Sequence, residues 1–415
     1  MIDTGNTAFI LICTALVFIM TPGLGFFYGG LGRRKNVVNN MMASVSIMGL
    51  GMTMWVLCGY SLTFAGNTAG VIGTLDQVGL QNITLSAPSP YAPTIPSYAF
   101  IAFQMMFALI TPAILTGSIS GRMKFKALFL FIIFWSFLVY YPLAHMVWGQ
   151  GGLLGADGLG SLDFAGGNVV HISSGITGFI LCILLGRRKE YEHTAYRVHN
   201  IPFVMLGMAL LWFGWFGFNA GSVLAADGLA THAFMTTATS AATAMMTWII
   251  IDINKYGKPT LIGACTGAVA GLVAITPGAG FVPVWSALLI GAVASPICYF
   301  SIALIKKKFK FDDALDAFGC HGIGGIWGGV ATGIFADPAI NAAAKEGLIF
   351  GSTEQFTAQI LSILISIAIA VIGTLVCAGV TRIFTPLRVS KRDEQLGLDI
   401  SQHGETAYPS FSGLD

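Results

Sequence analysis

Two histidines in apolar segments, each preceded by an aspartate, are the residues of this sequence with the most evident chemistry. Asp163 stands eight residues before His171 in DFAGGNVVHISSG, and Asp316 stands five residues before His321 in DAFGCHGIGG. An imidazole can donate a hydrogen bond at one ring nitrogen and accept one at the other, and it titrates near neutral pH. Two neighbouring imidazoles could therefore relay a proton, if the fold brings them together.

The segments around these residues are too apolar for a water-soluble protein. Of the 415 residues, 55% are hydrophobic and only 10% are charged, whereas soluble chains are about a quarter charged. The sequence has eleven apolar runs of roughly the 20 residues that a helix needs to cross a bilayer. It therefore predicts an all-α integral membrane protein. The eleven transmembrane helices centre on residues 8–31, 38–65, 98–121, 127–149, 166–186, 201–220, 230–253, 261–276, 284–305, 317–335 and 356–384.

The basic residues predict the orientation of these helices. Twenty of the 21 Lys and Arg residues fall in odd-numbered loops or in the C-terminal tail region, and only Lys345 falls in an even-numbered loop. By the positive-inside rule the N-terminus lies outside a cell membrane and the C-terminus lies in the cytoplasm. The first residues lack the basic segment of a signal peptide, so we expect no cleaved leader. The formal net charge of +2 says little about partners, and we expect no nucleic-acid partner.

An inverted repeat is expected, because a repeat with an odd number of spans turns its second copy upside down. We predict a transporter domain over residues 1–387, with repeats at 8–190 and 199–336, a peripheral eleventh helix at 356–384, and a cytoplasmic tail at 388–415. At about 1.5 Å per residue, His171 lies roughly 12 Å below Asp163 and His321 about 7.5 Å above Asp316. The two imidazoles should therefore meet near the middle of the membrane.

Each of these four residues also has a structural interpretation. A histidine in a helix bundle can simply hydrogen-bond across helices. An aspartate at the start of a helix is typical of an N-cap, and both aspartates stand at the beginning of a span. A symmetric pair is harder to explain by packing alone, since ionisable residues within a membrane are costly and commonly mark a path for substrate or protons.

A second group of residues is placed by this topology at the level of the outer mouth: Phe103, Phe107, Trp148, Phe218 and Ser222. Aromatic faces attract cations by about 0.5 to 2 kcal/mol. A serine hydroxyl can accept a hydrogen bond from a donor such as ammonium. The combination suits a small cation that carries N–H groups. The alternative is the belt of aromatic residues that membrane proteins place at the interface irrespective of ligands.

Four motifs resemble signatures of the ammonium transporter family, which includes the Amt, Mep and Rh proteins. They are DFAGGNVVHISSG, LWFGWFGFNAGS, DAFGCHGIGG and GLDISQHGETAY. The resemblance covers essentially the whole chain and is closest to the microbial Amt branch. It implies an eleven-helix inverted-repeat fold, a homotrimer with one pore per subunit, and transport of ammonium or ammonia with methylammonium as an analogue. It implies neither enzymatic activity nor a cofactor.

The resemblance also implies roles for individual residues. It implies that Phe107, Trp148 and Ser222 form the external ammonium site, with Asp163 beneath them. It implies that Phe103 or Phe107 forms a stacked gate with Phe218, and that His171 and His321 line the pore. The tail motif resembles a regulatory tail that helps to form the docking surface for a PII signal protein. A flexible polar terminus is the alternative interpretation of the tail.

The predicted mechanism follows from the cost of burying charge. A bare ammonium ion in an apolar pore would lose hydration worth tens of kcal/mol in the idealised limit. Burial of this kind favours loss of the proton, so ammonia would pass and the histidines would handle the proton. The sequence does not decide whether net charge moves. Two other functions stay open: an ammonium sensor with little flux, and a redox subunit in which the histidines hold haem.

Overall fold

The structure is a computed structural model that describes residues 1–189, 191 and 198–408. Helices dominate the described residues, and the only strands there are the short pair β1 (Pro88–Ser89) and β2 (Ala92–Pro96). The all-α prediction is confirmed. Arg197, counted above among the basic loop residues, and the tail from residue 409 onward lie outside the described residues.

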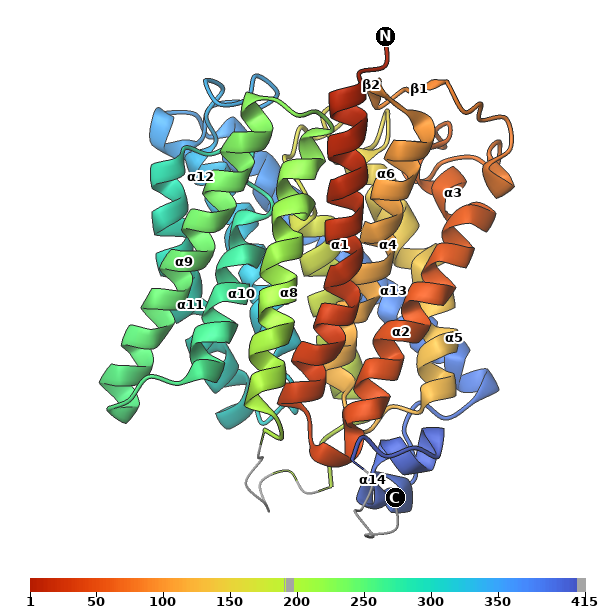
Figure 1. Cartoon of the computed structure of the whole chain (residues 1–415), viewed down its shortest axis with the longest axis vertical. Helices are drawn as coiled ribbons and strands as arrows, with labels where there is room; N and C mark the ends of the chain where they lie inside the picture. The colour runs from red at the N-terminus through yellow and green to blue at the C-terminus, as the bar shows by residue number, and fades with distance from the viewer. Residues whose placement is uncertain (190, 192–197, 409–415) are drawn as a thin grey trace.

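The long helices follow the predicted segments in order and run side by side as a bundle (Figure 1). They are α1 (Thr4–Leu31), α2 (Val37–Met54) with α3 (Tyr60–Phe64), α4 (Ser97–Ile119), α5 (Phe125–Trp135) with α6 (Tyr141–Trp148), α7 (Ser173–Leu185), α8 (Ile201–Ala220), α9 (Gly228–Tyr256), α10 (Leu261–Ile275), α11 (Val284–Lys307), α12 (Ile323–Phe335) and α13 (Glu354–Phe384).

Short helical turns complete these segments. Five are π-helical: η2 (Trp55–Gly59), η4 (Ser136–Tyr140), η5 (Gly167–Ile172), η7 (Phe318–Gly322) and η9 (Asp399–His403). Four are 3-10 turns: η1 (Arg34–Asn36), η3 (Val78–Leu80), η6 (Gly221–Val223) and η8 (Leu348–Phe350). The tail adds the short helix α14 (Lys391–Leu396).

Nine helical segments of the described chain are long and apolar enough to cross a bilayer. The eighth predicted span corresponds to the shorter apolar helix α10, and the tenth to η7 followed by α12. The count of eleven crossings therefore stays a prediction at these two segments. The two termini lie at opposite ends of the bundle (Figure 1), as an odd number of crossings requires. We call these ends the N-terminal face and the C-terminal face.

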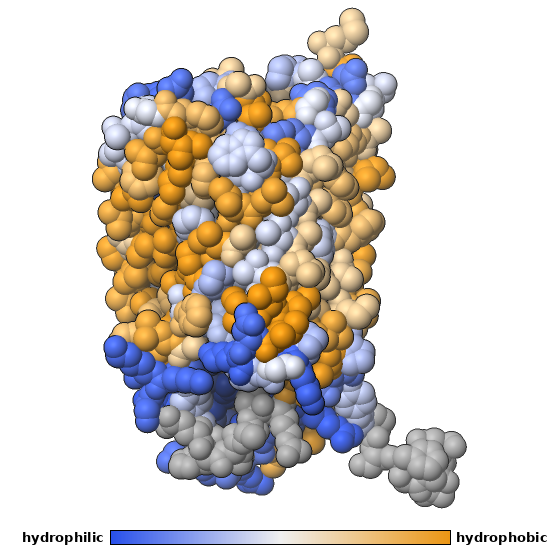
Figure 2. All heavy atoms as spheres, turned by 90° about the vertical axis from the view of Figure 1, so that its left-hand side faces the viewer, coloured by the Kyte–Doolittle hydropathy of each residue, from blue (hydrophilic) through white to orange (hydrophobic). Residues whose placement is uncertain are grey.

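One side of the bundle is apolar between two polar rims. Figure 2 shows this band on the side formed by the helices at the left of Figure 1. The exposed apolar side chains of α9 and α11 include Phe234, Met246, Ile250, Leu288 and Phe300. A band of this size is costly in water and favourable in lipid. The chain is a multi-pass membrane protein.

Glycines allow the fifth and tenth segments to approach each other closely. A Cβ atom at Gly175 of α7 would lie only 2.3 Å from the backbone nitrogen of Gly322, and one at Gly325 of α12 would lie 3.0 Å from Cβ of His171. Each of Gly175 and Gly325 stands four residues after the histidine of its own segment. The contact is thus repeated in both halves of the bundle, and it brings the two histidine-bearing turns together.

Candidate functional site

The two histidines meet in the interior of the bundle. Nδ1 of His171 lies 3.2 Å from Nδ1 of His321, and the ring centroids are 5.2 Å apart. Both side chains are buried, with 1% and 4% of their surface exposed. The prediction that they meet is confirmed. Only one proton can lie between the two Nδ1 atoms, so in the neutral pair one ring carries its proton at Nδ1 and the other at Nε2.

Both histidines lie in π-helical turns. His171 belongs to η5 and His321 to η7, and each turn continues directly into an α-helix. A π-helical turn holds an extra residue, is rare, and occurs frequently at functional sites. Residue spacing alone predicts regular helices here and indicates neither turn. Their effect is to change which side chains face the neighbouring segment just before α7 and α12.

Asp163 holds the first of these turns in place. Its carboxylate accepts hydrogen bonds of 2.5 to 3.2 Å from four consecutive backbone N–H groups, those of residues 166 to 169. The expectation that the Asp163 carboxylate accepts backbone N–H groups at the start of this span is therefore confirmed, although the N-cap position itself is Gly166. Burial raises the pKa of this carboxyl, and the four N–H groups oppose the rise. Its backbone oxygen also accepts the indole N–H of Trp148 at 2.9 Å, so Asp163 positions His171 and Trp148 together.

The corresponding prediction for Asp316 is wrong, because Asp313 caps the second turn. Oδ2 of Asp313 accepts hydrogen bonds from the N–H groups of Phe318 at 3.0 Å and Gly319 at 3.3 Å. Its Oδ1 accepts one from the hydroxyl of Ser118 at 2.7 Å. Asp313 stands eight residues before His321, the same spacing that separates Asp163 from His171. The two halves therefore repeat one arrangement of cap, turn and histidine.

The backbone explains why Asp316 does not act as the cap. Asp316 occupies the position that Gly166 has in the other half, three residues after the capping aspartate, and both residues have positive φ angles, 62° and 118°. Left-handed backbone at this position turns the chain into the helix. The carboxylate of Asp316 instead forms an ion pair with Lys306 of α11, with 2.5 Å between Oδ1 and Nζ.

A cavity of about 270 Å³ opens near the N-terminal end of α4 and the ends of α6 and α8, and we call it the mouth cavity. Three residues predicted for the external site line it, namely Phe107, Trp148 and Ser222, whereas Phe103 and Phe218 do not. Asp163 does not line the cavity, but it contacts the lining residue Trp148 through its backbone oxygen. The full lining is Phe64, Tyr91, Phe100, Gln104, Phe107, Val147, Trp148, Phe164, Ser222 and Leu224.

Aromatic rings connect the mouth cavity to the histidine pair. Phe107 stacks on Phe218 with 4.4 Å between centroids and 29° between planes, and Phe218 stacks in turn against His171 at 6.2 Å and 25°. Phe103 meets Phe107 edge to face at 5.1 Å and packs behind it against Gly221. Of the two phenylalanines considered for the stacked gate, Phe107 is the one that stacks on Phe218.

The polar groups of the mouth cavity are neutral, and most of their hydrogens are already used. The Trp148 indole N–H is bonded to Asp163. The Ser222 hydroxyl donates to the backbone oxygen of Phe218 at 2.8 Å, and the Tyr91 hydroxyl donates to that of Phe64 at 2.9 Å. No carboxylate is found in the described lining. Aromatic faces and hydroxyl lone pairs favour a singly charged cation with N–H groups over an anion.

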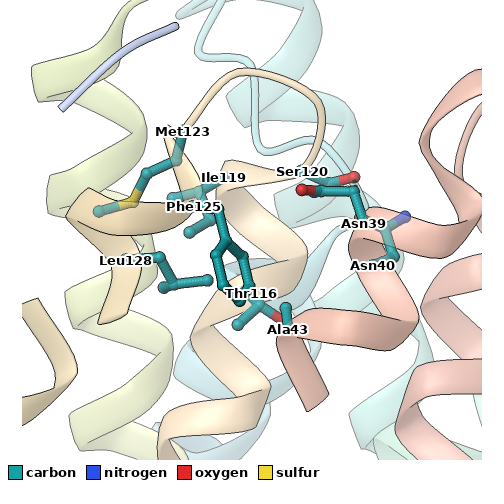
Figure 3. A pocket seen from close by; sticks show the side chains of 9 residues that line it. All are labelled: Asn39, Asn40, Ala43, Thr116, Ile119, Ser120, Met123, Phe125 and Leu128. Atoms are coloured by element: carbon teal, nitrogen blue, oxygen red, sulfur yellow. Dashed lines mark hydrogen bonds between the residues drawn. The ribbon is translucent and has the colours of Figure 1, made fainter. Parts of the chain in front are cut away.

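The tail is docked against the C-terminal face. Oδ1 of Asp399 accepts a hydrogen bond of 2.8 Å from the backbone N–H of Asn39 near the start of α2. The imidazole of His403 lies 3.1 Å from the side-chain oxygen of Asn39 and packs edge to face on Phe125 at 4.8 Å. Asn39 and Phe125 also line a small cleft of about 10 Å³ between α2, α4 and α5. In Figure 3, Ser120 and the asparagines lie at one end of this cleft and Met123 and Leu128 at the other.

The tail also holds the connection between the two halves of the bundle. The carboxylate of Glu394 accepts hydrogen bonds from the backbone N–H of Lys189 at 2.6 Å and from the guanidinium of Arg388 at 2.7 Å. The hydroxyl of Tyr408 lies 2.9 Å from Nε2 of His199. The alternative of a tail without fixed contacts is thus wrong for residues up to Tyr408.

Sequence reasoning missed two residues of this site. Asp313 was overlooked because Asp316 is closer to His321 in the tenth predicted span. The eight-residue spacing between Asp163 and His171 identifies Asp313, which stands eight residues before His321. Gln104 lines the mouth cavity and is the only amide side chain of α4. A lone amide in an otherwise apolar span is itself a signal, because such a group is costly unless it has a partner.

Comparisons of the sequence and the fold with known proteins all point to one protein family. The chain matches the pattern of the Ammonium Transporter Family over residues 8–408. It is 49% identical to the ammonium transporter of Bacillus subtilis, over 97% of this chain and 98% of that protein. Its structure is similar to crystalline Saccharomyces cerevisiae Mep2, with a TM-score of 0.90, 37% identity, and coverage of 99% and 93% of the two chains. It is also similar to a sensor Amt protein, with a TM-score of 0.86, 27% identity, and coverage of 96% and 98%.

Proposed function

Because the chain belongs to the ammonium transporter family, we propose that it recruits ammonium at the mouth cavity, removes a proton and conducts ammonia past the histidine pair. The observation that carries this proposal is the uninterrupted series of rings from Phe107 through Phe218 to His171 and His321. A cation entering this buried series would lose its hydration at a cost of several kcal/mol. A neutral ammonia molecule avoids that cost. Potassium cannot, since it has no proton to lose.

The histidine pair offers a path for the proton. Nε2 of His171 is buried and has no hydrogen-bond partner among the described residues. In the proposed relay, ammonium gives a proton to this nitrogen as its own N–H bond breaks, the Nδ1 proton of His171 moves to Nδ1 of His321, and Nε2 of His321 releases its proton to water on the C-terminal side. The first two steps each break one N–H bond and form another, the last breaks an N–H bond and forms an O–H bond, and both tautomers are reversed at the end. Transport by this route moves one positive charge with each ammonia.

The proposal extends to the protein's setting. It places the N-terminus and the mouth cavity outside a cell membrane and the C-terminus in the cytoplasm, and it takes the protein to act as a transporter rather than an enzyme. The support for the orientation is the distribution of the 21 Lys and Arg residues and the positive-inside rule. A homotrimer with one pore per subunit is proposed from family membership. Native mass spectrometry of the detergent-solubilised protein would test it, and a monomer would contradict it.

We also propose that the docked tail regulates transport and forms part of a surface for a PII signal protein. The support is that the tail contacts both the start of α2 and the connection between the halves. Removing residues after Arg392 tests this, with Tyr408→Phe as a milder variant that loses only the hydroxyl contact. The deletion should change both transport and PII binding. Unchanged values of both would end the proposal.

Uptake of labelled methylammonium into vesicles tests the transport function itself. Vesicles with the protein should accumulate the label faster than empty vesicles, and saturably. The sensor alternative has some support from the similarity to a sensor Amt protein. A sensor with little flux would instead give saturable binding without accumulation. The haem alternative is disfavoured, because the imidazoles are hydrogen-bonded to one another at 3.2 Å. An absorption spectrum of purified protein with a haem band would revive it.

A further inference from the structure

Gln104 is a polar residue of the mouth cavity to which the proposed function gives no role. It lies on α4, one helical turn before Phe107 and on the same helix face. Its side-chain oxygen Oε1 is buried and has no hydrogen-bond partner within the described chain, and no hydrogen bond of its amide nitrogen is found there either. Gln104 is therefore a half-buried amide whose two polar atoms have no hydrogen-bond partner among the described residues.

A purely structural role does not account for this amide. A buried polar atom left without a partner costs roughly 1 to 3 kcal/mol. An aliphatic residue at position 104 would fill similar space among Phe64, Phe100 and Phe107 without that cost. The other polar side chains of the cavity, Tyr91, Trp148 and Ser222, all donate to backbone oxygens. Among the polar side chains of the described lining, only the amide of Gln104 makes no hydrogen bond within the protein, so it is free to bind a ligand.

We propose that Gln104 contacts the substrate and supplies the second neutral hydrogen-bond acceptor of the mouth cavity, beside the hydroxyl oxygen of Ser222. This inference rests on the proposed function and deepens it. Rotation of the terminal amide can present Oε1 to a cation, and it breaks no protein hydrogen bond. Ammonium has four N–H groups. Two of them are met by Gln104 and Ser222, and the others face the rings of Phe107 and Trp148.

The neutrality of this acceptor is part of the inference. A carboxylate at position 104 would hold the cation more tightly through its charge, and it would attract potassium as well as ammonium. It would also oppose loss of the proton, because a nearby negative charge favours the charged form of a base. An amide attracts the N–H groups without these penalties. Residue 104 therefore sets the balance between capture of ammonium and its release as ammonia.

The test compares Gln104→Met and Gln104→Glu with the parent in proteoliposomes, by following ammonium-induced currents over a range of concentrations. Gln104→Met keeps the length of the side chain and should raise KM about tenfold with the maximal current within about twofold, as expected for loss of one hydrogen bond to a cation. Gln104→Glu should lower KM and the maximal current together and make potassium a competitor.

Gln150→Met is the matched control, since Gln150 lies at the same face outside the cavity and its amide already donates to Pro90. It should behave like the parent. A KM in Gln104→Met equal to that of the parent would overturn the inference, and so would Gln104→Glu without potassium competition. Such results with a normal parent current reject the role of Gln104 alone. Absence of any ammonium-dependent current or uptake in the parent would instead reject the proposed function.

Discussion

The two halves of the bundle repeat one arrangement, but they differ in how much charge surrounds it. In one half, Asp163 caps the turn that carries His171, and in the other, Asp313 caps the turn that carries His321. We call these the Asp163 half and the Asp313 half. Both have a π-helical turn, a cap eight residues before the histidine and a glycine four residues after it. The repeated parts position the imidazoles. The differences between the halves therefore indicate which further role each half has.

The Asp163 half faces a cavity with neutral walls, whereas the Asp313 half lies among ion pairs. Asp316 pairs with Lys306, and the adjacent Asp312 pairs with Arg188 at 2.5 Å and Arg122 at 3.3 Å. Burial alone would raise the pKa of Asp312, but Arg188 and Arg122 hold it below its usual range. The first half thus suits capture of a cation by neutral groups. The second suits a fixed and charged anchor at the C-terminal face.

The largest expected effect comes from spreading the two halves apart with Gly175→Ala. The new Cβ would lie 2.3 Å from the backbone nitrogen and 2.5 Å from Cα of Gly322, which cannot move without displacing His321. Displacement of this kind should lower transport about a hundredfold. Gly325→Ala is the matched variant, because its Cβ has looser contacts: 3.0 Å to Cβ of His171, 3.1 Å to the side chain of Ile172 and 3.3 Å to the backbone oxygen of Gly167. It should cost severalfold, and equal losses in both variants would contradict the account of this crossing.

Removing the caps should affect the two halves unequally. Asp163→Ala leaves four buried N–H groups without an acceptor and frees Trp148, so it should lower methylammonium uptake by about thirtyfold. Asp313→Ala leaves two N–H groups and the hydroxyl of Ser118, and it should cost about tenfold or less.

The asparagine variants sharpen the same comparison. Asp313→Asn should restore uptake almost fully, because its oxygen can face the two N–H groups while its nitrogen donates to Ser118, whose hydroxyl can accept. Asp163→Asn should recover only part, since its nitrogen would face N–H groups that need an acceptor. Full recovery at position 163 with none at position 313 would reverse the predicted order.

A third prediction concerns pH and stability. Burial, together with the nearby charge of Asp316, raises the pKa of Asp313 to about 6, whereas an unfolded Asp titrates near about 3.9. Between these two values the folded state binds more protons than the unfolded state, so this group's contribution to stability is full below the window and is lost as pH rises through it.

Asp313→Asn removes that dependence. The Tm of the parent should therefore fall by a few degrees relative to Asp313→Asn as the pH of the detergent solution is raised from about 4 to about 7. Thermal unfolding followed by intrinsic fluorescence would measure the difference. A constant or widening advantage of the parent with rising pH would show that Asp313 is not destabilised by its charge.

The smallest expected effect is that of making the Asp313 half resemble the other half with Asp316→Gly. Glycine would relieve the left-handed backbone at φ 62°, worth roughly 1 to 2 kcal/mol. It would remove the ion pair with Lys306, whose partly exposed charges contribute about 1 kcal/mol or less. Stability should change by about 1 kcal/mol or less, and uptake should stay within about twofold of the parent. A severe loss of uptake would give Asp316 a direct part in transport.

The sequence was enough to predict the helical segments and the meeting of the histidines, because both depend on regular spacing. Apolar runs identify spans by composition, and the rise along a helix placed His171 and His321 at similar depth from opposite faces. The ring series was predicted only in part. Phe103 and Phe107 are four residues apart on one helix, so sequence spacing could not decide which of them stacks on Phe218.

The rest depends on local backbone that no spacing rule describes. Counting residues along regular helices gave Asp316 as the partner of Asp163, whereas the π-helical turns and the left-handed residue at 316 make Asp313 the cap. Gln104 became a candidate only once the hydrogen bonds of its neighbours in the mouth cavity were known. Chemistry at this site is set by which polar atoms already have partners, and a sequence does not show that.

The central claim is that the buried ring series admits ammonia and excludes bare cations, while the histidine pair carries the proton. Currents in proteoliposomes given matched pulses of ammonium and potassium test it most directly, with His171→Ala and His321→Ala beside the parent. The account predicts a parent current with ammonium but none with potassium, and loss of the ammonium current in both variants. A parent current with potassium, or an ammonium current that persists in both histidine variants, would contradict it.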